Sequence, residues 1–160
     1  MTIDAFKKGI EEMYQGEIIG EVALNGMLPL FTEAERQYKL ATILQLETET
    51  KARLRPTLLR LGIELGEQEA SRDAGQQMAD AMRGKTWQEA MATLRDGVEP
   101  YVRRYQEILE STPSEYRDIA ESMVVHEQSI VDFAVLELDV HVERSVKSIE
   151  AQLKFKLPRP

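Results

Sequence analysis

Apolar residues recur at spacings of three and four along almost the whole chain, and no stretch alternates regularly between apolar and polar residues. The recurring pattern is typical of amphipathic helices, whereas alternation would indicate half-buried strands. Short stretches containing Gly, Pro or Ser separate the periodic segments, as expected for the connections between helices. The sequence therefore predicts an all-α protein.

Prolines and capping residues predict the ends of the first two helices. A first helix is expected from residue 2 to residue 28, because Pro29 cannot continue the helical hydrogen bonding. Thr32 and Glu35, in the sequence "TEAE", have the spacing of a capping box. A second helix is therefore expected from about residue 33 to about residue 62.

The second half of the chain predicts three further helices. Residues 67–83 are polar with a thin apolar stripe, which indicates a short connecting helix. Thr86 and Glu89 form another potential capping box and open a long helix to about residue 110. A proline suited to a first helical turn then opens a fourth long helix, from about residue 113 to about residue 154.

The length of 160 residues corresponds to one domain, which we expect to span residues 1–160. Four long helices and one short helix predict an antiparallel four-helix bundle, with the short helix in the connection between the second and third long helices. A single core that contains all four long helices is the expected result.

Composition argues against several classes of partner and limits the candidate metal ligands. A net charge of -8 and a pI near 4.9 disfavour binding to nucleic acid or to anionic membranes. The chain contains no cysteine, so carboxylates and its two histidines remain as the candidate metal ligands. The sequence starts without a signal-peptide pattern and has no apolar run long enough to span a bilayer, which predicts a cytoplasmic protein.

Ionisable residues interrupt the inward-facing stripes of three of the four long helices. They are Glu17 on the first, Glu47 and Lys51 on the second, and His126 and Glu137 on the fourth. An unpaired buried carboxylate costs several kcal/mol, so such groups are usually protonated, paired with a cation or bound to a metal. A metal site in the core is one interpretation.

The other interpretation places these residues at the margins of the stripes, with Glu47 near Lys51 and Glu137 near His141 as solvated pairs. Spacing limits which of them can act together. Glu137 lies eleven residues beyond His126, about 16 Å along a helix, so these two residues cannot share an ion.

Two stretches resemble the ferritin-like superfamily, in particular its rubrerythrin-type members. These are "YKLATILQLET" at 38–48 and "YRDIAESMVVHE" at 116–127. The resemblance implies a di-iron site with one Glu on each of two helices and Glu-x-x-His on each of the other two. Leu44 and Glu47 occupy the Glu and His positions of the first motif, and Met123 and His126 those of the second.

The resemblance implies a bundle that binds iron, as one ion or two, for oxidoreductase-type chemistry. The metal ligands it implies are Glu17, Glu21, Glu47 and His126. A metal-free descendant is the alternative, with Leu44 and Met123 filling the former site and with a role in protein interaction or small-molecule binding. Bundles of this superfamily often pair side by side, so a homodimer is also expected.

Overall fold

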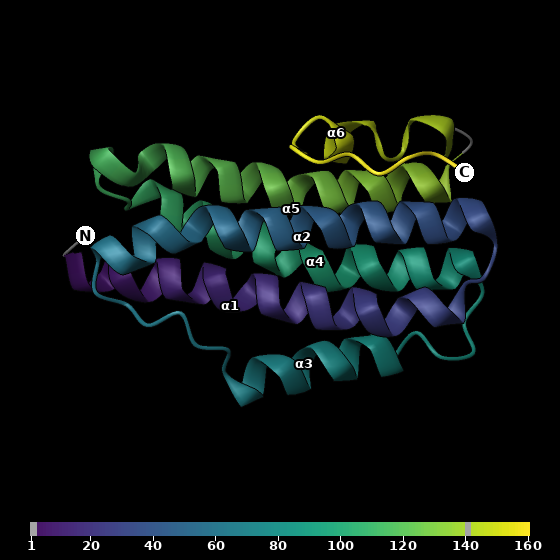
Figure 1. The fold of residues 1–160 in the computed structure, drawn as a ribbon, viewed down its shortest axis with the longest axis horizontal. Helices are drawn as coiled ribbons and strands as arrows, with labels where there is room; N and C mark the ends of the chain where they lie inside the picture. Colours follow the sequence, from purple (N-terminus) through teal and green to yellow (C-terminus); the bar gives the residue numbers. More distant parts are fainter. Residues whose placement is uncertain (1–2, 140–141) are drawn as a thin grey trace.

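The computed structural model describes residues 3–139 and 142–160, and all regular structure in this part of the chain is helical. The long helices lie side by side along the long axis of the molecule, and a shorter helix lies beside α1 (Figure 1). The long helices are α1 (Ile3–Met27), α2 (Ala34–Arg60), α4 (Trp87–Glu110) and α5 (Arg117–Leu138), and the shorter one is α3 (Glu69–Asp80). The all-α prediction is confirmed.

Short helical turns complete the described chain. They are η1 (Leu28–Leu30), η2 (Ser114–Tyr116), η3 (Val142–Arg144) and α6 (Lys147–Glu150). Within the described residues, no helix has the length and apolar character needed to cross a membrane.

One of the two predicted capping boxes is present. At the start of α4, the Glu89 amide donates to the Thr86 hydroxyl over 3.3 Å, and the Thr86 amide donates to the Glu89 carboxylate over 2.8 Å. The box predicted at Thr32 is wrong, because α2 begins one residue later with Glu33 as its N-cap. The Glu33 carboxylate accepts a hydrogen bond from Arg36 and does not cap the helix.

The fourth long helix ends earlier than predicted. It stops at Leu138, and residues 142–160 fold back to lie against α5 and α2 instead of extending the helix to residue 154 (Figure 1). Polar contacts fix this return: the backbone amides of Lys154 and Phe155 donate to Glu49 over 2.6 and 2.9 Å. Val146, Ile149 and Leu153 are thus buried by reversal of the chain, whereas Val142 and Phe155 are exposed.

Helix α3 packs on α1 through small residues and one glutamine. Ala79 approaches Gly26 so closely that a Cβ at residue 26 would lie 2.5 Å from the Ala79 Cβ. The Gln15 side chain donates to the carbonyl of Gly66 over 2.8 Å and accepts from the Ser71 hydroxyl over 2.9 Å. These contacts hold α3 along the side of α1, within reach of α4.

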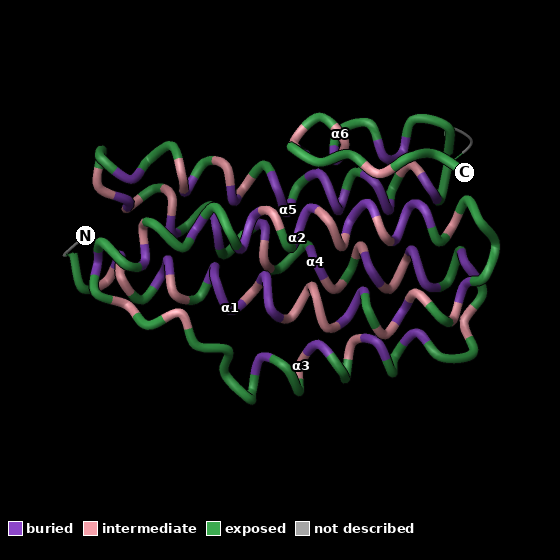
Figure 2. Tube along the Cα trace, in the orientation of Figure 1, coloured by how far each residue is buried: buried purple, intermediate pink, exposed green. Residues whose placement is uncertain are grey.

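Buried residues recur along every long helix, whereas the segment after α5 is mostly exposed (Figure 2). The buried apolar side chains form two clusters, one toward each end of the long helices. The first includes Leu24, Ile43, Leu94 and Ile130, and the second includes Met13, Leu54, Ile108 and Met123. On α1, α2 and α5, the change from one cluster to the other falls close to Glu17, Glu47 and His126, whereas Glu137 lies near the C-terminal end of α5.

Candidate metal centre

Three of the four predicted ligands meet between the two apolar clusters. Nε2 of His126 lies 3.5 Å from Oε2 of Glu17 and 3.4 Å from Oε2 of Glu47. Each residue offers one ligand atom, and these three atoms all lie within 4.8 Å of one another. Helices α1, α2 and α5 therefore each contribute one potential ligand to a single point.

Burial at this point is complete for two of the residues. Glu17 and His126 are 0% exposed and Glu47 is 5% exposed, so the interpretation that places them at solvated stripe margins is wrong. Among the described residues, both carboxylate oxygens of Glu17 and Nε2 of His126 have no hydrogen-bond partner. Buried polar atoms without a partner are rare in proteins and call for a ligand, a water or a proton.

The far side of the His126 ring is fixed by α2. Its Nδ1 lies 3.1 Å from the Thr50 hydroxyl, one turn along the helix from Glu47. In the neutral tautomer that carries its proton on Nδ1, this nitrogen donates to Thr50 and the lone pair of Nε2 faces Glu17 and Glu47. This is the arrangement that orients histidines in metal sites.

Two glycines on α1 make room for the group. A Cβ at residue 20 would lie 2.4 Å from the carboxyl carbon of Glu47, and a Cβ at residue 16 would lie 2.1 Å from the hydroxyl of Tyr105. Gly16 and Gly20 lie on either side of Glu17 and carry no side chain. The Glu47 carboxylate from α2 and the Tyr105 hydroxyl from α4 occupy the space that side chains would otherwise fill.

Two further ionisable groups lie at the site, and the sequence pattern did not predict them as part of it. Glu127 is 7% exposed and acts electrostatically on Glu17 and His126. Tyr105 is fully buried, and its hydroxyl has no hydrogen-bond partner among the described residues. Glu127 lies off the apolar stripe of α5, so its position directly after His126 was the only signal available.

The pKa values of these groups show how costly the negative charge is at this position. Burial raises the pKa of Glu17 well above its ordinary value, and the charges of Glu47 and Glu127 raise it further. Burial raises the pKa of Glu127 to about 8; His126 opposes this rise and Glu47 adds to it. Burial and nearby carboxylates likewise raise the pKa of the Tyr105 phenol.

His126 responds in the opposite way to the same charges. Burial lowers the pKa of the imidazole, but the carboxylates of Glu47 and Glu127 outweigh this effect and leave the pKa above its ordinary value. Excess negative charge therefore dominates the site, and a cation would relieve it.

The fourth predicted ligand, Glu21, lies outside the group. Its carboxylate accepts hydrogen bonds from Lys51, and from the Thr48 hydroxyl over 2.7 Å. Lys51 also lies 3.3 Å from Glu67 in the connection to α3. The prediction that Lys51 pairs with Glu47 is thus wrong, because Lys51 points toward α1 and the connection.

Glu137 is separate from the site, as its spacing predicted. Its carboxylate accepts from Lys39 over 2.6 Å and from the indole of Trp87 over 2.8 Å, and all three side chains are buried. The predicted partner His141 lies outside the described residues. Glu137 therefore links α2, α4 and α5 through its ion pair with Lys39 and its hydrogen bond from Trp87.

Comparison with protein-family models, with curated proteins and with solved structures finds no match to this chain.

Proposed function

We propose that this chain is a ferritin-like four-helix bundle that binds a divalent transition metal, iron in the first instance, in its core. The proposed ligands are Glu17, Glu47 and His126. The observation that carries the proposal is the meeting of three buried ligand atoms within 4.8 Å, among which those of Glu17 and His126 have no hydrogen-bond partner in the described chain.

The two separations from Nε2 of His126 fit a shared ion. Ligand atoms held about 2.1 Å from one metal ion at a tetrahedral angle lie about 3.4 Å apart. The distances from Nε2 of His126 to Glu17 and Glu47 are 3.5 and 3.4 Å. These values exceed a good hydrogen bond and match two ligands of one ion.

Charge supports the same assignment. Two ionised carboxylates and a neutral imidazole carry a charge of −2, which a divalent cation neutralises without further residues. Carboxylate and imidazole donors together suit iron, manganese or zinc. When bound, iron would supply redox chemistry toward dioxygen or peroxide, while the two apolar clusters limit the access of water.

The rest of the site positions and balances these ligands. Thr50 holds the His126 ring, Gly20 leaves space for the Glu47 carboxylate, and Glu127 and Tyr105 provide a carboxyl and a phenol beside the ligands. Because the pKa of Glu17 is raised, metal binding near neutral pH should release a proton from this side chain.

Anaerobic equilibrium dialysis with Fe(II) tests the proposal. Wild-type protein should bind about one ion per chain, and Glu17→Gln, Glu47→Gln and His126→Gln should each lower the affinity beyond the 10–100-fold typical of an outer-shell change. Glu137→Gln is the matched control, because it also replaces a buried glutamate but outside the cluster. Equal affinity in all five proteins would contradict the proposal.

A metal-free bundle is the second candidate, and the raised pKa values of Glu17 and Glu127 favour it. Protons on these carboxyls would neutralise the buried group in the absence of any cation. In that case wild-type protein would bind no Fe(II) above the level of the His126→Gln variant.

A further inference from the structure

A narrow cavity of about 40 Å³ begins beside the candidate metal centre and runs between α1 and α4. Its α1 lining extends from Gly16 to Met27, which corresponds to about 16 Å of helix. Helix α3 covers it with Met78, which reaches 3.7 Å from the position of a Cβ on Gly97 of α4. We call this cavity the channel, because the residues that line it follow the helix axes.

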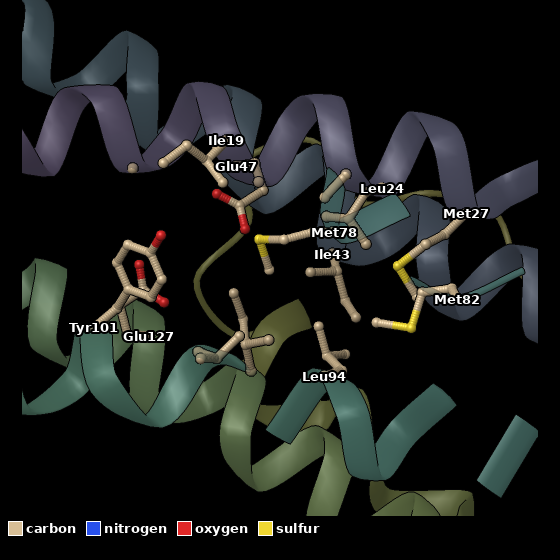
Figure 3. A pocket seen from close by; sticks show the side chains of 15 residues that line it. Ile19, Leu24, Met27, Ile43, Glu47, Met78, Met82, Leu94, Tyr101 and Glu127 are labelled. Atoms are coloured by element: carbon tan, nitrogen blue, oxygen red, sulfur yellow. The ribbon is translucent and has the colours of Figure 1, made fainter. Parts of the chain in front are cut away.

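The polar groups of the channel lie at one end. Glu47, Tyr101 and Glu127 lie together in Figure 3, and Leu24, Met27, Met82 and Leu94 lie toward the other end. The order along each helix agrees, because α2 contributes Glu47 and then Ile43, while α5 contributes Glu127 and then Ile130. A molecule with one polar end and one unbranched apolar end would match this division.

The channel approaches solvent at its polar end. A depression on the surface shares Gly16, Ile19 and Tyr101 with it. Tyr101 is only partly buried, so its ring stands between solvent and the channel. A guest entering here would pass its apolar end inward and leave its polar end beside Glu47 and Glu127.

Methionine side chains make the wall of the channel adaptable. Met27, Met78 and Met82 line the channel, and methionine side chains are flexible and tolerate different neighbours. A bound molecule that is longer than the cavity can therefore be accommodated by movement of the methionine side chains, without movement of the backbone.

The polar end selects against charged head groups. An anionic head would be placed against the acidic side chains Glu47 and Glu127, and no basic residue is among the described residues that line the channel. A cationic head would give up its hydration in a mostly apolar space, a cost that pairing with buried carboxylates often does not offset. A hydroxyl can both donate to and accept from these groups at a much lower cost of desolvation.

We propose that the channel between α1 and α4 binds a short, unbranched, uncharged aliphatic molecule with a terminal hydroxyl, its head beside Glu47, Tyr101 and Glu127. This binding needs no metal, although the channel shares Glu47 with the proposed iron site.

The test uses metal-free, full-length protein with labelled methionine methyl groups, titrated with n-butanol, n-hexanol and n-octanol and followed by NMR. Saturable shifts are expected at Met27, Met78 and Met82. Methyls of methionines that do not line the channel, Met13, Met91 and Met123, serve as internal controls. Affinity should rise about fourfold per added methylene until the channel is filled.

Two substitutions on α4 give a matched pair. Val98 lines the channel and Val102 does not, although both are buried to nearly the same extent, 6% and 7% exposed. Val98→Phe should lower n-hexanol affinity at least tenfold, whereas Val102→Phe should leave it within about twofold. Met78→Ala enlarges the channel and should strengthen n-octanol binding, which keeps the proposal testable if Val98→Phe does not fold.

Three results would each overturn the proposal. The first is uniform or non-saturable shifts at all six methionines. The second is equal n-hexanol affinity in Val98→Phe and Val102→Phe together with no gain in Met78→Ala. The third is tighter binding of hexylammonium or hexanoate than of n-hexanol, which would assign the polar end to a charged head group.

Discussion

Replacing Glu127 with Gln should stabilise the metal-free protein, although the residue is buried at the candidate site. The folded protein holds the pKa of Glu127 at about 8, against an ordinary value of 4.5. Folding at neutral pH therefore takes up a proton at this residue, and that uptake costs free energy. Glutamine keeps nearly the same shape and requires no proton.

The magnitude follows from linkage between folding and protonation. The ordinary pKa of 4.5 lies 2.5 pH units below pH 7, and the cost grows by about 1.36 kcal/mol per unit, so at pH 7 it is about 3 kcal/mol. Because the folded pKa of this acid is raised, the cost is absent below pH 4.5 and grows as pH rises toward 8. For a chain of this size it corresponds to about 6 to 12 °C in Tm.

Urea unfolding in EDTA at several pH values between 5 and 8 measures this effect. The stability difference between Glu127→Gln and wild type should be small at pH 5 and should increase steadily with pH. Glu137→Gln provides a control of opposite sign at pH 7, because it breaks the buried pair with Lys39 and should cost about 3 to 5 kcal/mol. A pH-independent difference for Glu127→Gln would refute the assignment of a buried, raised-pKa carboxyl.

Two further substitutions test how the site is positioned. In anaerobic dialysis, Gly20→Ala should lower Fe(II) affinity at least tenfold, because its Cβ would lie 2.4 Å from the Glu47 carboxyl carbon. Gly97→Ala is the control and should leave the affinity unchanged, because the nearest atom to its Cβ would be 3.7 Å away. Thr50→Val removes the hydrogen bond to Nδ1 of His126 and should lower metal affinity about 10–100-fold while circular dichroism shows an intact fold; unchanged affinity would contradict a positioning role for Thr50.

Much of the fold follows from local rules that the sequence displays directly. The capping box at Thr86 correctly predicted the start of α4, because the required side chains and the apolar run coincide there. The box at Thr32 failed because Glu33 takes the N-cap position. The spacing of the residues does not show which of two adjacent polar residues takes the N-cap position.

The end of the fourth long helix could not be predicted from periodicity. Val146, Ile149 and Leu153 continue helical spacing in the sequence and are buried in the structure. They are buried because the chain reverses after Leu138 and packs back on the core. An apolar stripe specifies burial but leaves open whether the helix continues or turns back.

The candidate site was partly visible in the sequence. Glu17, Glu47 and His126 interrupt apolar stripes, and the structure places all three in one buried group. Glu21 was expected there because it lies one turn from Glu17, but its carboxylate instead accepts a hydrogen bond from Lys51. Glu127 was missed because its contact with the group depends on how α5 is rotated against its neighbours.

The proposed function requires Glu17, Glu47 and His126 to share one metal ion. X-ray diffraction at the iron absorption edge, on crystals prepared anaerobically with Fe(II), locates iron without assuming its ligands. We expect an anomalous peak about 2.0 to 2.2 Å from Nε2 of His126 and from one oxygen of each glutamate. Absence of a peak among these three side chains in crystals soaked to saturation would contradict it.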